Sequence, residues 1–342
     1  MAALNSFSTS STNKPQQTIP EHINMNKILC IGEALIDMIC TDRGMALSDG
    51  EHFIKKAGGA PMNVAAAIGA LGGDVAVAAK VGEDPFGKHL VEVLNGFNVD
   101  TRHVIKDPRH FTTLAFVSLM ENGERDFYFN RGADGQLSAE ETESIHLQSF
   151  GIAHFGSATG FLPGPLQTAY SKMFYKALDE NLFISFDPNY RELLFGKNKE
   201  DFILRSWAFM EKADFFKVSD EEAMLLTGRS SIDEAAIAFM ERTKAVFAIT
   251  LGKEGALLGL EGDTFLVPSI VIEQVDTTGA GDAFVGAMLF QLSKFSKNEM
   301  TALDAAAWKN IFSNANKAGA RTCGYMGAME AFKHLSSEIF NK

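Results

Sequence analysis

Residues 276–282 read DTTGAGD, a glycine turn with an acid at each end. An extended apolar run, 269–275, precedes the turn, and an amphipathic run of small residues, 283–290, follows it. The pattern predicts a strand, a tight turn and a helix with Asp282 in its first turn. Because glycines let the backbone approach a ligand closely, the N–H groups of Gly279, Ala280 and Gly281 can surround an anion there. Asp282 is placed to accept a proton from an attacking hydroxyl. Glycine turns and first-turn acids are also ordinary helix starts, so the motif alone leaves both readings open.

Strand and helix patterns alternate along the chain before this turn. Apolar runs indicate strands at 28–39, 75–81, 152–157, 182–187, 215–219 and 246–251, and amphipathic runs indicate helices near 62–71, 86–95, 165–179, 220–227 and 231–241. Two helical stretches, 301–320 and 329–340, end the chain. This alternation predicts an α/β fold in which helices cover both faces of a mostly parallel sheet. Ligands should gather at the carboxyl ends of the strands.

Two segments break the alternation. Residues 37–57 and 111–131 have strand character without intervening helices, and they predict a small accessory sheet. Such a sheet can serve as a lid that excludes water during group transfer, or it can extend the antiparallel edge of the main sheet. Residues 25–342 are expected to form one domain. Residues 1–24 are rich in Ser, Thr, Asn and Gln, and we interpret them as a disordered extension, with a targeting peptide as the alternative.

Charge and cysteine content exclude several classes of function. The net charge of −12 argues against nucleic acid or an anionic membrane as a partner, because phosphate groups favour Lys and Arg. No apolar run approaches the ~18 residues that span a bilayer. Three cysteines without metal-type spacing argue against a disulfide framework or a zinc site. A reducing, cytoplasmic location fits best.

Four local signatures occur in a characteristic order. They are GEALID at 32–37, GGAPMNVA at 58–65, DPNYR at 187–191 and the turn at 276–282. Together they resemble the ribokinase-like, or pfkB, carbohydrate kinases, and the first two signatures taken together are most similar to fructokinases. The resemblance implies a ribokinase-like three-layer α/β/α core with a β-sheet lid. It also implies ATP-dependent phosphorylation of a primary hydroxyl of a ketohexose, most of all fructose to fructose 6-phosphate.

The resemblance assigns roles to individual residues. Asp282 would be the catalytic base, with the N–H groups of residues 279–282 around the phosphoryl group. The sugar would be bound by the carboxylate of Asp37, the amide of Asn63 and the guanidinium groups of Arg131 and Arg191. Gly58 and Gly59 would allow it to approach the backbone closely. Without the family context, these residues also fit a tight βα turn, a strand-end acid and surface arginines.

The nucleotide end is less specific. The resemblance places ATP against Ser219, Thr250, Gly252, Gly255 and Asn314. Glu222 would hold Mg²⁺ through water. Asp276 would hold K⁺ with backbone carbonyls near Thr278, Thr322, Tyr325 and Gly327, or would simply hold the glycine turn. Ser219 stands where the family has Asn, and Ser-x-x-Glu is also an ordinary helix capping box.

Other functions remain as alternatives. 2-Keto-3-deoxygluconate kinase shares the DPNxR form, and Arg131 could then bind the substrate carboxylate. A non-catalytic regulatory protein on the same fold is the alternative of a different class. A P-loop NTPase and a dinucleotide oxidoreductase are disfavoured because G-x-x-x-x-G-K-[ST] is absent and no G-x-G-x-x-G follows the first strand. The expected partners are a sugar and ATP, with a homodimer through the lid strands.

Overall fold

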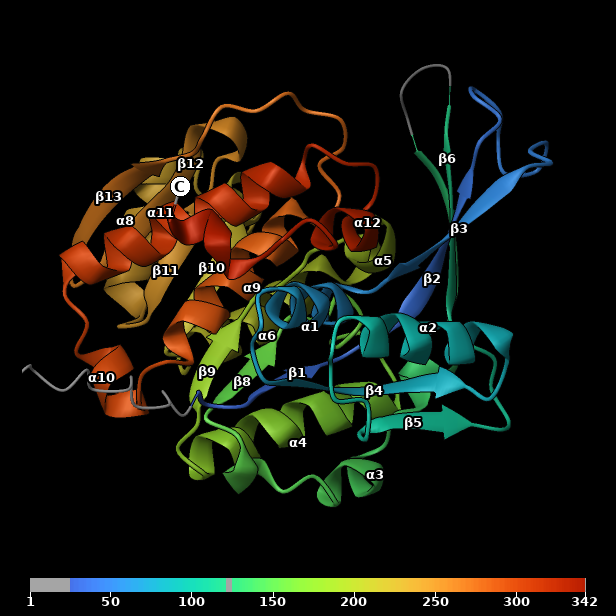
Figure 1. Cartoon of the computed structure of the whole chain (residues 1–342), viewed down its shortest axis with the longest axis horizontal. Helices are drawn as coiled ribbons and strands as arrows, with labels where there is room; N and C mark the ends of the chain where they lie inside the picture. The colour runs from blue at the N-terminus through green and yellow to red at the C-terminus, as the bar shows by residue number, and fades with distance from the viewer. Residues whose placement is uncertain (1–24, 121–124, 342) are drawn as a thin grey trace, which may run out of the picture.

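The structure is a computed structural model that describes residues 25–120 and 125–341 (Figure 1). The predicted disordered extension, residues 1–24, lies outside the described residues. No helix of the described part is long and apolar enough to cross a membrane.

The described residues form a large sheet of nine strands in the order β13-β12-β11-β10-β9-β8-β1-β4-β5. Its strands are β1 (Ile28–Ile31), β4 (Val75–Gly82), β5 (Val104–Asp107), β8 (Ile152–Phe155), β9 (Phe183–Phe186), β10 (Phe215–Ser219), β11 (Val246–Thr250), β12 (Gly255–Leu260) and β13 (Asp263–Pro268). All neighbours from β11 to β5 pair in parallel, and β12 and β13 add an antiparallel edge. The central strands are buried along their whole length, which explains their continuous apolar runs.

Helices cover both faces of this sheet, as the alternating pattern predicts. Within β1, Ile28 and Cys30 face one apolar core, whereas Leu29 and Ile31 face the other. The first core is closed by α1 (Ala60–Ala70), α2 (Pro85–Gly96), α9 (Ala280–Leu292), α10 (Lys297–Thr301), α11 (Ala305–Thr322) and α12 (Ala328–Phe332). The second face carries α3 (Ala139–Glu143), α4 (Pro165–Asp179), α5 (Glu192–Phe195), α6 (Lys199–Met210), α7 (Asp220–Thr227) and α8 (Ile232–Arg242). The three-layer α/β/α prediction is therefore confirmed.

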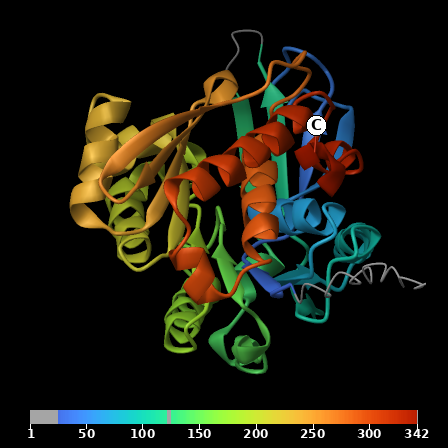
Figure 2. The ribbon, with the colours of Figure 1, turned by 60° about the vertical axis from the view of Figure 1, so that its left-hand side comes forward.

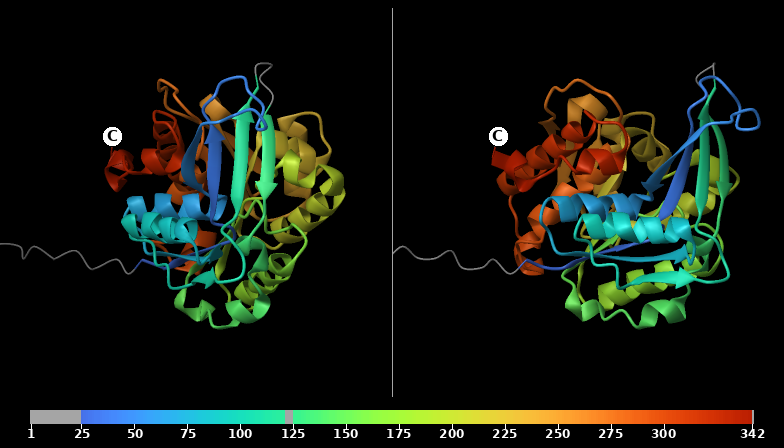
Figure 3. Two further views of the ribbon diagram at one scale, coloured as in Figure 1. Left: turned by 90° about the vertical axis from the view of Figure 1, so that its right-hand side faces the viewer. Right: turned by 45° about the vertical axis from the view of Figure 1, so that its right-hand side comes forward.

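A second sheet of four strands, called the small sheet below, projects from one side of the molecule (Figure 3). Its order is β3 (Phe53–Gly58), β2 (Leu35–Cys40), β6 (Leu114–Leu119) and β7 (Arg125–Asn130). These strands fall in the two segments that lacked helices. The apolar run 28–39, expected as one strand, is split: β1 ends at Ile31, residues 32–34 turn, and β2 enters the small sheet. Periodicity could not show this break, because both strands are apolar.

Two other expectations about elements are corrected. Residues 269–274 form no strand, because β13 already ends at Pro268 and the run has no partner strand; Val271 is fully exposed. At the C-terminus, the stretch expected at 301–320 starts later, since the Asp304 carboxylate accepts the N–H of Ala307 at 2.8 Å and caps α11. The stretch expected at 329–340 is the short helix α12 followed by a 3₁₀ turn at 337–341.

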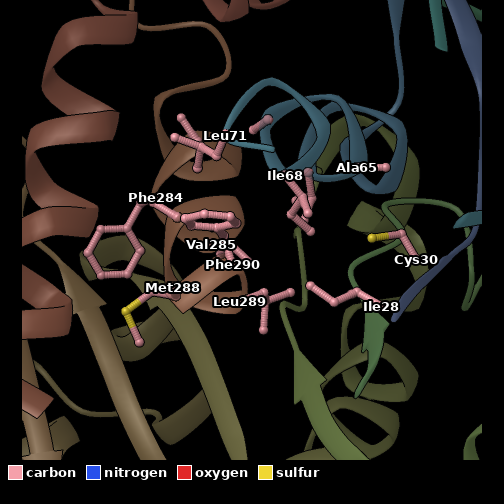
Figure 4. Packing of buried hydrophobic residues seen from close by; sticks show 14 of the residues in the cluster. Ile28, Cys30, Ala65, Ile68, Leu71, Phe284, Val285, Met288, Leu289 and Phe290 are labelled. Atoms are coloured by element: carbon pink, nitrogen blue, oxygen red, sulfur yellow. The ribbon is translucent and has the colours of Figure 1, made fainter. Parts of the chain in front are cut away.

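Close packing of α1 against α9 sets the position of the α9 N-terminus. Helix α9 lies between α1 and α11 (Figure 2). Ile68 of α1 points toward the apolar side chains of α9 (Figure 4). At the tightest point Gly286 meets α1: a Cβ there would lie 2.8 Å from the Ala67 Cβ and 3.2 Å from the Val64 carbonyl oxygen. Only a residue without a side chain allows this approach.

We therefore expect Gly286→Ala to destabilise the fold by about 1–3 kcal/mol, since overpacking outweighs the ~1 kcal/mol that Ala gains over Gly in a helix. Gly96→Ala at the end of α2 is the matched control, because its Cβ would meet nothing within 4 Å. Urea unfolding followed by circular dichroism gives both free energies of unfolding. A Gly286→Ala variant as stable as Gly96→Ala would contradict this account of the packing.

Candidate phosphoryl-transfer site

The glycine turn ends in a helix N-terminus with open backbone donors. Gly279 precedes α9 with φ +82°, and a Cβ there would lie 2.5 Å from that of Ala328, so both conformation and space require glycine. Ala280 donates its N–H to the Thr277 carbonyl at 3.1 Å, which corrects the expectation that this N–H is open to an anion. The N–H groups of Gly281 and Asp282 have no partner among the described residues. With the helix dipole, they form an anion-binding end.

Asp282 sits beside these donors. Its Oδ2 accepts a hydrogen bond of 2.8 Å from the Asn63 side-chain amide of α1. The pKa of Asp282 is raised to about 6, chiefly by burial and in smaller part by the Asp187 carboxylate. The Asn63 amide and the charges of Lys217 and Arg191 lower this pKa. The carboxyl group is therefore ionised at neutral pH, but more basic than an exposed aspartate.

Lys217 belongs to the same cluster and was missed in the sequence. Its Nζ lies 3.2 Å from Asp187 Oδ2 and 3.3 Å from the point that a Cβ on Gly281 would occupy. Burial lowers the pKa of Lys217, but Asp187, Glu222 and Asp282 outweigh burial and raise it. A buried ammonium thus lies directly beside the α9 N-terminus. The available signal was a lysine near the end of an apolar strand, where ligands of parallel sheets gather.

Asp37 and the paired glycines meet at the root of the small sheet. A Cβ on Gly58 would lie 2.2 Å from Asp37 Oδ2, so the carboxylate rests against bare backbone. Gly59 has φ +107°, and a Cβ there would lie 2.6 Å from the Glu33 carbonyl oxygen. The pKa of Asp37 is raised to about 6 by burial and in smaller part by Glu33, against the opposing charge of Arg191.

Arg191 connects the two acids electrostatically. Its guanidinium donates to the Tyr190 carbonyl at 2.9 Å and to Asn189 Oδ1 at 3.3 Å, and its side chain is otherwise open to solvent. The charge of Arg191 lowers the pKa of both Asp37 and Asp282. The structure therefore brings together the predicted residues Asp37, Gly58, Gly59, Asn63, Arg191 and Asp282.

Glu222 and Ser219 form the helix cap that their spacing also allowed. Ser219 Oγ accepts the Glu222 N–H at 3.1 Å, and Glu222 Oε2 accepts the Ser219 N–H at 2.8 Å. Glu222 Oε1 accepts the Tyr190 N–H at 2.8 Å, which ties α7 to the turn that carries Arg191. Only 7% of Glu222 is exposed. Both carboxylate oxygens keep a further lone pair for a water molecule.

The residues expected at the nucleotide are only partly brought together. Thr250 ends β11 beside Ser219 and donates to the Val218 carbonyl at 3.3 Å. Gly252 and Gly255 form the turn into β12. Asn314 is buried between helices and donates to Gln291 Oε1 at 2.8 Å, so it presents no polar group at this edge. Its helical position could not show which side faces the core.

Asp276 holds the glycine turn. Oδ1 accepts from the Thr278 N–H at 3.0 Å and from its hydroxyl at 2.7 Å, and Oδ2 accepts from the Gly327 N–H at 2.8 Å. Burial alone would raise the pKa of Asp276, but these hydrogen bonds and the charge of Lys56 lower it. No cluster of three or more His, Cys, Asp or Glu residues that could hold a metal occurs in the described ranges.

Arg131 contacts a neighbouring loop and Asp134. Its terminal nitrogens donate to the Pro163 carbonyl at 2.8 Å and the Thr159 carbonyl at 3.3 Å, and Nε lies 3.6 Å from Asp134 Oδ2. Thr159 in turn donates to Asp134 at 2.9 Å. The guanidinium therefore anchors the loop that contains residues 159–163 to the root of β7.

Comparisons with known proteins agree with this geometry. Residues 25–334 match the model of the pfkB family carbohydrate kinases. The chain is 36% identical to fructokinase-1 of Zea mays, over 88% of this chain and 93% of that protein.

Solved structures agree as well. A crystal structure of fructokinase from Xylella fastidiosa with bound ATP has a TM-score of 0.81 at 27% identity and covers 92% of this chain and 97% of the other. A fructokinase double mutant of Vibrio cholerae, bound to fructose, ADP and potassium, has a TM-score of 0.80 at 29% identity and covers 93% and 97%. The chain belongs to the pfkB family of carbohydrate kinases.

Proposed function

We propose that this kinase transfers the γ-phosphoryl group of ATP to the primary hydroxyl of a ketohexose, converting fructose to fructose 6-phosphate. The observation that carries the proposal is the pairing of Asp282, ionised and hydrogen-bonded to Asn63, with open N–H groups in the same helical turn. Arg191, whose charge acts on both Asp282 and Asp37, and the Asp37 carboxylate are groups that suit sugar hydroxyls.

The reaction follows from these positions. Asp282 accepts the proton of the sugar hydroxyl as the oxygen attacks the γ-phosphorus and the bond to the β-phosphate oxygen breaks. The N–H groups of Gly281 and Asp282 and the ammonium of Lys217 stabilise the negative charge on the phosphoryl oxygens. When bound, Mg²⁺ neutralises the phosphates, and Glu222 would hold it through water. The remaining catalysis is positioning, which the rigid α1–α9 contact supports.

The hydrogen bonds of Arg131 favour fructose over 2-keto-3-deoxygluconate as the substrate. That arginine was the expected partner of a substrate carboxylate, but its two terminal nitrogens each donate to a backbone carbonyl, one to Pro163 and one to Thr159. The fructokinase relatives of plants and bacteria point the same way. A non-catalytic regulator on this fold would need neither an ionised Asp282 nor its open donors.

We further propose that K⁺ binds beside the turn. Asp276 is ionised and adjoins the loop 322–327, whose carbonyl oxygens are the hard ligands that such a cation prefers. A bacterial relative was crystallised with potassium.

Pairing of two chains through the small sheet is a proposal as well. Ile39 and Ile54 lie opposite each other on one face of the sheet, and both are exposed together with Leu119. A cytoplasmic location is proposed because the three cysteines are free thiols.

Replacing Asp282 tests the mechanism. We expect Asp282→Asn to leave the affinities for ATP and sugar nearly unchanged and to lower kcat by at least ~10²-fold, because the base is lost and the contacts remain. Asp233→Asn, an exposed acid in the first turn of α8, is the matched control and should keep full activity. Steady-state kinetics and calorimetry measure both. Near-normal turnover of Asp282→Asn would refute the assignment.

The pH profile gives an independent test. Because burial raises the pKa of Asp282 to about 6, the base is protonated as pH falls, and kcat should decline through a midpoint near pH 6. The Asn63 amide stabilises the ionised form, so Asn63→Ala should move this midpoint to higher pH. Asn298→Ala, an exposed amide on α10, should leave it in place. A midpoint unchanged by Asn63→Ala would show that the hydrogen bond does not act on the base.

A coupled assay with fructose, ribose, 2-keto-3-deoxygluconate and fructose 6-phosphate tests the substrate. We expect kcat/KM to be highest for fructose. A preference for 2-keto-3-deoxygluconate would overturn the assignment of Arg131 as an anchoring residue. Failure to phosphorylate any of the four sugars, in potassium and in sodium buffers, would favour the regulatory alternative.

A further inference from the structure

Lys56 of the small sheet lies on the same face as the sugar-site acid. In the antiparallel pair of β2 and β3, Lys56 is directly opposite Asp37. Residues directly opposite each other in such a pair project from the same face of the sheet. Lys55, the next residue, projects from the other face, where its Nζ lies 6.0 Å from the centre of the Phe86 ring.

The side chain of Lys56 reaches the loop that supports the anion-binding turn. Its Nζ lies 3.6 Å from the point that a Cβ on Gly327 would occupy. Gly327 donates its N–H to Asp276, and the next residue, Ala328, packs directly against Gly279. The end of β3 and helix α12 are in contact, although they are distant in sequence (Figure 1). The ammonium therefore lies beside Gly327, and the residue after Gly327 packs against the turn that starts α9.

The ammonium of Lys56 has no hydrogen bond or ion pair with any residue that the structure describes. The charge of Lys56 contributes to lowering the pKa of two carboxylates, those of Asp276 and Glu330. Each of them has other partners: Asp276 accepts from Thr278 and Gly327, and Glu330 pairs with Lys333 at 2.6 Å. A half-buried cation without a partner, beside the loop that packs against the start of α9, is complementary to an anion rich in oxygen.

We propose that Lys56 binds the terminal phosphoryl group of the bound nucleotide, so that the small sheet supplies a cation to the α9 N-terminus. The inference rests on the proposed phosphoryl transfer at Asp282. One face of the sheet would then contact both reactants, the sugar through Asp37 and the γ-phosphate through Lys56. The lysine would strengthen binding of a triphosphate over a diphosphate, because ADP has no group at this position.

Nucleotide binding without sugar tests the proposal. Calorimetry on the full chain, at one fixed potassium concentration, compares Mg·ADP with the magnesium complex of the β,γ-imido analogue of ATP. We expect Lys56→Met to weaken the analogue by about 10-fold, as for the loss of one charge-assisted hydrogen bond, and to change ADP by less than about 2-fold. Lys55→Met should change neither affinity. Lys56→Arg should restore part of the loss, since it keeps the charge.

Each other outcome overturns the inference. An equal loss for ADP and the analogue would show that Lys56 only supports the loop at Gly327. The same selective loss in Glu330→Gln would assign the effect to that carboxylate. Unchanged affinity for the analogue in Lys56→Met would refute the contact. A wild-type chain that binds neither nucleotide would instead refute the proposed kinase reaction, and unfolding curves for each variant verify the fold.

Discussion

The contact between α1 and α9 at Gly286 and Ala67 is the constraint on which the site depends. It brings the two helices so close that a single added methyl group would have to displace the backbone of α1. Because both helices are rigid, this distance also sets the 2.8 Å hydrogen bond between Asn63 and Asp282, one turn away on each helix. The amide that we propose to bind the sugar and the carboxylate that we propose to accept its proton are thereby held together by the fold itself.

The electrostatics of the site follow from burial with nearly balanced charge. The charge of Lys217 acts on Asp187 and Asp282, and the charge of Arg191 acts on Asp37 and Asp282. Burial raises the pKa of Asp282, while the two cations and the Asn63 amide restrain that rise. An acid titrating near pH 6 is ionised at neutral pH and still basic enough to take a proton, which an ordinary exposed aspartate does less well. Helix α9 adds open donors beside it, so the proposed proton transfer and charge stabilisation would both take place at one helix end.

Short sequence segments predicted the structure correctly where the residues that determine a conformation lie within a few positions of one another. The glycine turn, the paired glycines and the strand–helix alternation predicted elements that the structure contains, because each depends on backbone freedom or on burial of a whole strand. Local patterns failed where the environment decides. The apolar run 269–275 has no partner strand, Asn314 points into a helix interface, and Lys217 is important only because strand β10 ends beside α9. Similarly, Arg131 donates to the carbonyls of Thr159 and Pro163, and the residues next to Arg131 in the sequence do not indicate these contacts.

The sequence by itself determined the fold class, the family and the identity of the turn that ends in Asp282. These properties are encoded in short segments whose residue types permit few backbone conformations. Only the tertiary structure decided which charges face one another. It placed Lys217 against Gly281, set Asn63 on Asp282, and carried Lys56 from β3 to the loop at Gly327, over separations of tens to hundreds of residues. Electrostatic interactions depend on distance and burial in space, and neither quantity can be read from position along the chain.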